Sequence, residues 1–315
     1  MFNMNMLRNH CSQLAKNEYK KPDIVYVEGF PIPSKIFTQE NFRSAINYKA
    51  RPDDIFLVAY PKCGITWLQC IVWEIFNKGA PLPSFWEMMV EHVPFLERTG
   101  AEAVENMKPP RIIKVHLPYH LIPKHPLAKY IFLARNPFDC CVSFYHHTKN
   151  FSDTYGFSDG TFNDYFECFI RGEVQCGDYL DYLLSWWPHR HDTNVLFITF
   201  EEMKSNPEII LLKIAKFLGI QFYTMLKTDT KLAQKILEIT DFHTMKSKMD
   251  LTFYRSVDKN NDVKIVKNVN FFREGSVGNW KSYFTKEQTR RLIDHIKEKT
   301  RDTDICLLWK DIMNS

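Results

Sequence analysis

Long apolar runs are missing from this 315-residue sequence. No stretch reaches the ~18 consecutive apolar residues that a membrane-spanning helix needs, and no apolar secretion signal interrupts the N-terminal segment MFNMNMLRNHCSQLAKNEYKK. We therefore expect a cytoplasmic protein with no membrane partner. Paired cysteines are missing too, because the eight cysteines form no CxxC pair and follow no regular spacing. This argues against a zinc site or a disulfide framework and favours reduced thiols.

A large excess of one charge is also absent. The chain has 41 Lys and Arg against 37 Asp and Glu, a formal net charge of +4. That is far below the basic density of proteins that bind nucleic acid by charge alone, so we expect no nucleic-acid partner. Apolar residues make up 45% and aromatic residues 15%, a globular composition rich in rings. Internal repeats and low-complexity tracts are missing.

Short apolar runs typical of buried strands alternate with segments of helical period, which predicts an α/β fold. We interpret the whole chain, 1–315, as a single domain with a mainly parallel central sheet flanked by helices. Residues 1–20 are expected to be loosely ordered, and the polar segment 256–270 is expected to be a mobile loop. The expected strands are Ile55–Tyr60, Arg111–Val115, Tyr130–Ala134 and Val195–Phe200. The expected helices are Thr66–Lys78, one starting at Asn136 and Pro137, and one running from Asn206 to Gly219.

The turn between the first strand and the first helix has the features of an anion site. In FLVAYPKCGITW, Lys62 supplies charge, and Gly64 allows close approach to the unpaired N–H groups at a helix N-terminus. A Walker A loop places its lysine after the second glycine, whereas Lys62 precedes Gly64, so an ATP or GTP hydrolase fits poorly. Taken alone, the turn could equally be an ordinary connection between a strand and a helix.

The neighbouring motifs favour a phosphosulfate site. YPKCGITW resembles the 5′-phosphosulfate loop of the cytosolic sulfotransferases, which transfer a sulfuryl group from 3′-phosphoadenosine 5′-phosphosulfate (PAPS) to small acceptors. Three further segments resemble other motifs of that family in the same order along the chain: RIIKVHLP (Arg111–Pro118), RNPFDCCVS (Arg135–Ser143) and FFREGSVGNWKSYF (Phe271–Phe284). The sequence is therefore identified as a member of this family, and the resemblance implies that PAPS is the donor, that its product 3′-phosphoadenosine 5′-phosphate (PAP) is released, and that no metal is required.

Three residues are candidates for the chemistry. His116 suits a general base because a neutral imidazole titrates near pH ~6.5. Lys114 lies two residues earlier on the same strand, and the period of two places both side chains on one face. Lys62 would stabilise the charge on the leaving 5′-phosphate.

The resemblance assigns further residues to the donor. Arg135 and Ser143 would bind the 3′-phosphate together with Arg273 and the backbone at Gly275, and Trp67 and Phe242 would stack on the adenine, with Thr240 beside them. The full donor set is Lys62, Cys63, Gly64, Ile65, Thr66, Trp67, Arg135, Ser143, Phe200, Thr240, Phe242, Phe272, Arg273, Glu274 and Gly275. Phe200 stands where the family often has tyrosine, which keeps the ring and removes a hydroxyl.

An aromatic pocket is expected for the acceptor, which could be a phenol, a catechol or biogenic amine, a steroid or another alcohol. Phe95 matches a pocket position of the family. The other candidate wall residues are His146, His147, Phe151 and Tyr254.

Several positions depart from the family pattern. Cys63, Ile65 and Val115 replace residues that usually carry hydroxyls, which would weaken donor binding without abolishing it. Because Cys63 lies beside a lysine at a helix N-terminus, we hypothesise a lowered thiol pKa and a reactive thiol, with an inert buried thiol as the alternative.

The family dimer motif, KxxxTVxxxE, would fall at Lys281–Arg290. Lys281 and Thr285 are kept, but Lys286 and Arg290 replace the apolar and acidic residues, so a dimer is left open.

Two other functions stay open beside the sulfotransferase: a nucleotide-binding regulator without turnover, and a P-loop-like small-molecule kinase. The kinase would require magnesium and a true Walker lysine. Membrane-bound carbohydrate sulfotransferases share part of the motif set but would need a signal anchor.

Overall fold

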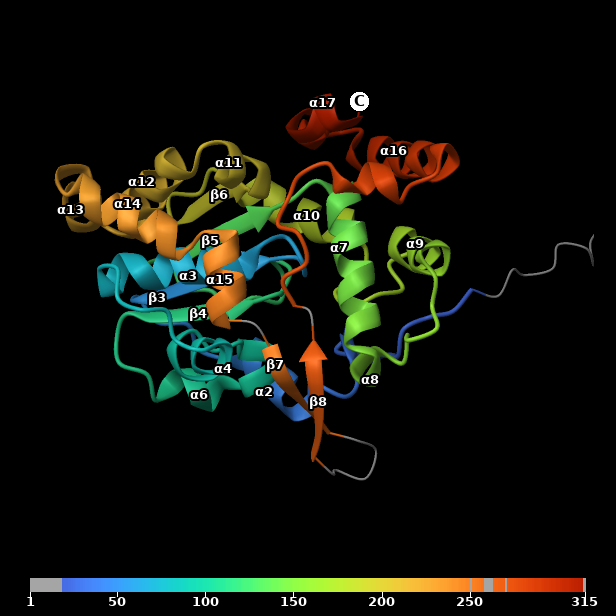
Figure 1. Cartoon of the computed structure of the whole chain (residues 1–315), viewed down its shortest axis with the longest axis horizontal. Helices are drawn as coiled ribbons and strands as arrows, with labels where there is room; N and C mark the ends of the chain where they lie inside the picture. The colour runs from blue at the N-terminus through green and yellow to red at the C-terminus, as the bar shows by residue number, and fades with distance from the viewer. Residues whose placement is uncertain (1–18, 250, 258–262, 270, 314–315) are drawn as a thin grey trace, which may run out of the picture.

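The computed structural model describes residues 19–249, 251–257, 263–269 and 271–313; for 251–257 and 263–269 it describes the backbone alone (Figure 1). Four parallel strands form the central sheet: β3 (Asp54–Ala59), β4 (Arg111–Val115), β5 (Lys129–Ala134) and β6 (Val195–Thr199), in the order β4-β3-β5-β6. In the register of the sheet, Leu57 lies opposite Lys114 on one side and Ile131 on the other. The strands are buried almost throughout, as expected for a parallel sheet covered on both faces. The predicted α/β fold is confirmed, and each predicted strand agrees within one residue at either end.

The helices that follow the strands begin at the predicted signals. Helix α3 (Ile65–Asn77) follows β3 after the turn at Gly64, and helix α12 (Pro207–Leu218) ends at Gly219. Helix α7 (Pro137–Asn150) follows β5, and its N-cap Asn136 accepts a hydrogen bond from Asp139 N. Asp139 also accepts from Gly278 N (2.7 Å) and Trp280 N (3.0 Å), so the first turn of α7 anchors the C-terminal motif against the end of β5.

The remaining elements surround this sheet. A small antiparallel pair, β1 (Ile24–Val27) and β2 (Phe30–Pro33), precedes it. The other helices are α2 (Gln39–Asn47), α4 (Phe85–Glu87), η1 (Met88–His92), α5 (Leu96–Thr99), α6 (Ala101–Glu105), α8 (Ser152–Tyr155), α9 (Phe162–Ile170), α10 (Tyr179–Trp186), η2 (Trp187–His189), α11 (Phe200–Ser205), α13 (Ile220–Thr228), α14 (Thr230–Ile239), α15 (Phe242–Met249), η3 (Asn279–Ser282), α16 (Lys286–Thr300), η4 (Ile305–Trp309) and α17 (Lys310–Met313).

The segment predicted as a loop at 256–270 includes the end of one strand and the whole of another. Strand β7 (Leu251–Val257) pairs antiparallel with β8 (Val263–Val269), and Figure 1 shows the pair at the edge of the molecule opposite α16 and α17. The prediction of an irregular loop is wrong because Val263, Ile265, Val266 and Val269 are β-branched residues that favour a strand even among polar neighbours. Residues 258–262 and 270 lie outside the described residues, as do most of residues 1–20, so the predictions made for their mobility stay predictions.

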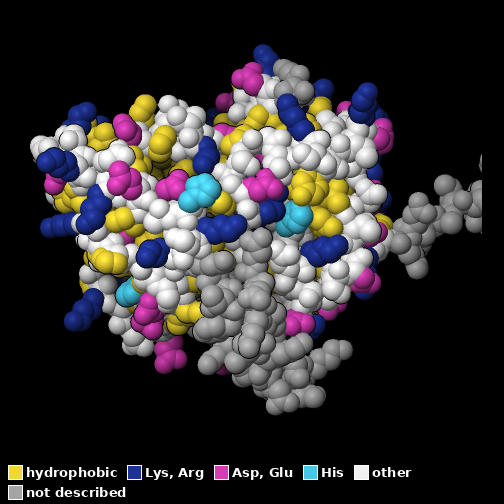
Figure 2. Space-filling view, viewed as in Figure 1, with side chains coloured by type: hydrophobic (Ala, Val, Ile, Leu, Met, Phe, Trp, Pro, Cys, Tyr) yellow, Lys and Arg dark blue, Asp and Glu magenta, His cyan; other side chains and the backbone are white. Residues whose placement is uncertain are grey.

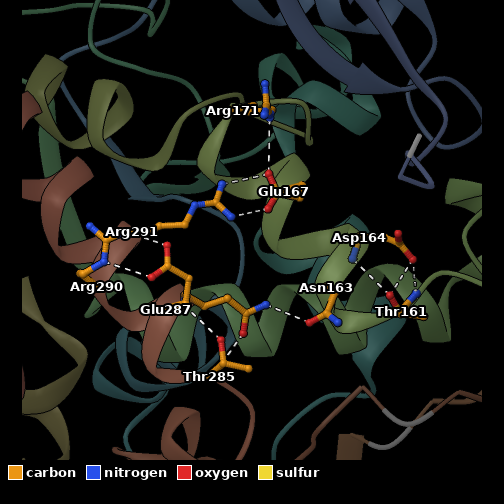
Figure 3. Close-up of polar contacts among 10 residues, drawn as sticks. Thr161, Asn163, Asp164, Glu167, Arg171, Thr285, Glu287, Arg290 and Arg291 are labelled. Carbon is orange, nitrogen blue, oxygen red and sulfur yellow. Dashed lines mark hydrogen bonds and ion pairs between the residues drawn. The ribbon is translucent and has the colours of Figure 1, made fainter. Parts of the chain in front are cut away.

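Polar contacts fix helix α16 against α9 (Figure 3). Arg291 makes a bidentate ion pair with Glu167 at 2.5 and 3.0 Å, and Gln288 Nε2 donates to Asn163 Oδ1 at 2.9 Å. Arg290, the residue that alters the family dimer motif, pairs within its own helix with Glu287 (2.7 Å) and Asp294 (3.0 Å). Its charge is thus balanced inside the chain, and a dimer stays an open prediction.

Acidic and basic side chains mix across the face that carries α15, as Figure 2 shows. Among the described residues, no helix combines the length and the apolar character that crossing a membrane requires.

Candidate active site

A cavity at the carboxyl ends of β3, β4 and β5 brings the motif segments together, where ligands bind in open parallel sheets. Most of the predicted residues line it: Lys62, Gly64, Ile65, Thr66, Trp67, Phe95, Lys114, His116, Arg135, Ser143, His147, Phe151, Phe200, Phe242, Phe272, Arg273, Glu274 and Gly275. These residues come from seven stretches of the chain: 62–67, 95, 114–116, 135–151, 200, 242 and 272–275. The four motifs therefore converge on one site.

The turn before α3 is built for close approach. Lys62 has a φ of 69° and Gly64 a φ of 101°, so two residues of this short turn adopt the left-handed conformation. Gly64 is the N-cap of α3 and offers no side chain to cap the first N–H groups. A Cβ at Gly64 would lie 2.7 Å from Phe200 Cδ2, so the ring of Phe200 requires glycine here. The helix N-terminus is left facing the cavity beside a lysine, as an anion site needs.

His116 lies just past the end of β4 and is 7% exposed. Its Nδ1 is 2.5 Å from Ala59 O, and because a carbonyl oxygen only accepts, Nδ1 must carry the hydrogen. This fixes the tautomer in which Nε2 is the unprotonated nitrogen. Burial, and then the charge of Lys114, lower the pKa of His116 to about 3, so the imidazole is neutral near pH 7.

The two lysines near His116 titrate close to neutral pH. Burial, and then Arg135, lower the pKa of Lys62 to about 7; burial, and then Lys62, lower the pKa of Lys114 to about 7. Lys62 Nζ lies 4.4 Å from the ring centre of Phe271, and Lys114 Nζ lies 4.7 Å from that of Phe95. Neither lysine forms an ion pair among the described residues. Both ammonium groups would gain from a negatively charged ligand.

Two arginines define the other end of the cavity. Arg135 donates from its guanidinium to Lys62 O (3.1 Å) and Ser276 O (2.9 Å), while Arg273 donates to Glu274 and Asn279, each at 2.7 Å. The Nε atoms of both arginines are buried and have no hydrogen-bond partner among the described residues. Buried unpaired donors are costly, so an acceptor such as a phosphate oxygen suits this end. The donor set fits the 3′-phosphate of PAPS.

Aromatic rings surround the space between these charges. The ring centre of Phe200 lies 4.2 Å from Arg135 Cζ, so the ring packs on the guanidinium. Phe200 also meets Trp67 edge-on, with the two ring centres 5.7 Å apart. Phe242 lies against Gly275, whose φ is 61° and where a Cβ would come within 2.3 Å of the ring. These flat surfaces suit a purine.

Three predicted residues do not reach the cavity. Thr240 is buried at the C-terminal end of α14, where its hydroxyl donates a hydrogen bond to Ile236 O at 2.8 Å. His146 shares a hydrogen bond of 2.9 Å with the hydroxyl of Tyr283 and does not line the cavity. Burial lowers its pKa to about 4. The side chain of Tyr254 lies outside the described residues.

Cys63 is the third predicted residue that does not reach the cavity, and its position also contradicts the hypothesis of a reactive thiol. Its side chain is fully buried, 3.9 Å from the sulfur of Cys140, and does not line the cavity. Burial raises the pKa of the Cys63 thiol well above its ordinary value. The prediction of a lowered thiol pKa is wrong because a position next to Lys62 in the sequence does not fix the direction of the Cys63 side chain. In the turn, this side chain points into the core.

Several lining residues were not predicted from the sequence. They are mostly apolar and lie near Phe95 and Phe151: Ile36, Phe37, Phe85, Trp86, Met89, Arg98, Tyr155, Gln175 and Phe271. At the opposite end Lys204 was also missed; its Nζ lies 5.5 Å from the ring centre of Trp67. Phe271 had a signal, its place next to Phe272 in the C-terminal motif.

The comparisons with known proteins agree with this site. A family model described as the sulfotransferase domain matches residues 52–304. The chain is 30% identical to sulfotransferase 1C2 of Oryctolagus cuniculus, over 93% of this chain and 99% of the relative, and 33% identical to sulfotransferase 1A1 of Rattus norvegicus, over 91% and 97%. The chain therefore belongs to the sulfotransferase family, and the predicted enzyme class is confirmed.

Solved structures support the same conclusion. Mouse sulfotransferase SULT7A1 complexed with PAP superposes with a TM-score of 0.71 at 29% identity, covering 92% of this chain and 99% of that one. Retinol dehydratase in complex with androsterone and PAP gives a TM-score of 0.70 at 23% identity, covering 90% and 91%, and shows the shared fold. Among the described residues, no group of three or more His, Cys, Asp or Glu side chains could hold a metal ion. The expected absence of a metal stays a prediction.

Proposed function

We propose that this protein transfers a sulfuryl group from PAPS to a hydroxyl or amine of a small aromatic or alicyclic acceptor. The observation that carries the proposal is the meeting of Lys62, Lys114 and His116 in one cavity. That cavity has an apolar wall at one end, and at the other end two arginine Nε donors that have no hydrogen-bond partner in the part of the chain that the structure describes.

PAPS, when bound, supplies an electrophilic sulfuryl group on its 5′-phosphate. His116 accepts the acceptor's hydroxyl proton at Nε2 as the new O–S bond forms, and its Nδ1–H remains held by Ala59 O. Lys62 and Lys114 stabilise the charge that develops on the transferred group and on the bridging oxygen of the leaving phosphate. Arg135, Ser143, Arg273 and the backbone at Gly275 bind the 3′-phosphate.

The acceptor is assigned to the end formed by Phe95, His147 and Phe151. Phe95 meets His116 edge-on at 4.9 Å, so a flat acceptor against Phe95 would lie beside the proposed base. His147 is neutral, because burial first and then the charges of Lys62 and Lys114 lower its pKa well below its ordinary value. Phenols, catechols or biogenic amines, steroids and other alcohols all suit such a wall, and a cytoplasmic location remains our prediction.

Transfer of 35S from labelled PAPS to a mixed panel of phenols, catecholamines and sterols, without magnesium, tests the proposal. His116→Ala should lower kcat by ~10²- to 10⁴-fold, the usual contribution of a general base, and should leave PAP binding within a few-fold. His146→Ala is the matched control, because His146 is a histidine that contacts the Tyr283 hydroxyl and does not line the cavity. Equal activities of the two variants would contradict the role of His116.

The same experiment separates the other functions. PAP binding without transfer to any acceptor would favour the nucleotide-binding regulator. Phosphoryl transfer from ATP that requires magnesium would favour the kinase.

A further inference from the structure

A buried carboxyl group lies directly behind the proposed base. Glu97 belongs to the short helix α5 and is 2% exposed, yet no motif of the sequence assigns it a role. Its Oε1 accepts a hydrogen bond from the backbone N–H of His116 at 2.5 Å. Its Oε2 is buried and has no hydrogen-bond partner among the described residues.

The segment 94–97 closes the outer edge of β4. Lys114 N donates to Pro94 O at 3.0 Å, and Phe95 forms an isolated parallel bridge with Lys114. A continuing parallel strand would next offer a backbone carbonyl to His116 N, two residues further along. The chain turns into α5 instead, and the Glu97 carboxyl accepts that hydrogen bond in place of the missing carbonyl.

His116 is therefore held at two points from two sides. Its ring is tied to β3 through Ala59 O, and its backbone is tied to α5 through Glu97. Phe95, two residues before Glu97, packs against the ring edge-on at 4.9 Å. Removal of the Glu97 contact frees the backbone at the point where the chain leaves the sheet, and the direction of Nε2 changes with it.

We propose that Glu97 is a positioning residue for the transfer reaction, which orients His116 through its backbone N–H and takes no direct part in the chemistry. The inference rests on the proposed role of His116 as the base.

The hydrogen-bond acceptor, not a negative charge, carries this role. Burial raises the pKa of Glu97 to about 8, so the side chain is largely the neutral acid at pH 7. Glutamine copies that state, with one carbonyl oxygen and one N–H donor group in place of the O–H. Leucine has a similar size and lacks both.

Four variants test the inference by steady-state kinetics and PAP titration. Glu97→Leu should lower kcat by ~10- to 100-fold, as loss of a supporting contact behind a reacting group does, with PAP Kd and acceptor KM within about threefold. Glu97→Gln should restore kcat to within about threefold of wild type. Glu74→Leu is the matched control, a buried carboxyl on α3 outside the cavity, and should keep wild-type kcat. Glu97→Asp, which withdraws the carboxyl by one methylene, replaces Glu97→Leu if the latter does not fold, and should also lower kcat.

The outcomes are distinct. A kcat for Glu97→Leu or Glu97→Asp equal to that of Glu74→Leu would overturn the positioning role, and so would Glu97→Gln being as slow as Glu97→Leu. If His116→Ala itself keeps wild-type kcat, the proposed function fails first, independently of Glu97.

Discussion

Binding of PAP should weaken steeply as pH rises above 7, because the cavity holds lysines that are only partly charged in the free protein. Burial and the neighbouring guanidinium of Arg135 lower the pKa of Lys62 to about 7. A bound phosphate dianion favours the ammonium form and raises that pKa toward its ordinary value. Binding of PAP is therefore coupled to proton uptake, so the affinity for PAP falls as the pH rises.

The magnitude follows from that pKa. Between pH 7 and pH 9 each lysine that is recharged on binding raises Kd about tenfold per pH unit, which is roughly 2 × 1.36, or about 2.7 kcal/mol, over two units. PAP phosphates stay dianionic in this range, since their second pKa is about 6. Lys62→Met should raise Kd by ~10- to 150-fold at pH 7, from the loss of a hydrogen bond to a charged group worth about 1.5 to 3 kcal/mol. The substitution should also reduce the change of Kd with pH by about tenfold per pH unit. Lys114, whose pKa is also about 7, accounts for the pH dependence that remains.

Isothermal titration calorimetry at pH 6, 7, 8 and 9 provides the assay, with two buffers of different ionisation enthalpy at each pH to count the protons taken up. Lys248→Met, an exposed lysine on α15 that does not line the cavity, is the control and should match wild type. A wild-type Kd that is constant from pH 7 to 9, or an unchanged slope in Lys62→Met, would refute the reasoning.

Two further predictions concern glycine and a buried acid. Gly275→Ala should raise the PAP Kd at least tenfold, because the new Cβ would lie 2.3 Å from the Phe242 ring; Gly278→Ala, also at positive φ (90°) but with no atom within 4 Å, should cost similar backbone strain and leave Kd within about threefold. Equal Kd values for the two variants would contradict the close approach at Gly275. Glu74 is fully buried, its two side-chain oxygens have no hydrogen-bond partner among the described residues, and burial raises its pKa from 4.5 to about 7. The folded protein thus binds the extra proton between those pH values, so the unfolding free energy should fall as pH rises through this window, by up to 2.5 × 1.36 or about 3 kcal/mol. Urea unfolding at pH 5 and pH 8 should show that the unfolding free energy of Glu74→Gln falls less than that of the wild type between these pH values. The same pH dependence in both proteins would argue against a raised pKa for Glu74.

The sequence by itself determined the sheet and many of the residues that line the cavity. Runs such as Ile55–Tyr60 and Arg111–Val115 are apolar enough to predict buried strands, and the signals at Asn136 and Pro137 place a helix start correctly. These are local properties, fixed by backbone and side-chain preferences over a few residues. The family resemblance assigned Lys62, His116 and Arg135 to one site, and all three line one cavity, because parallel strands bring their carboxyl ends to one edge.

Only the tertiary structure decided which way single side chains point and which segments support them. Cys63 follows Lys62 directly, yet its thiol turns into the core beside Cys140, and His146 contacts Tyr283 while the adjacent His147 lines the cavity. Glu97 reaches His116 because α5 folds back along β4, a contact between residues 19 positions apart. Such directions depend on the turn geometry and on packing against distant elements, which act through space and leave no periodic signal in the sequence.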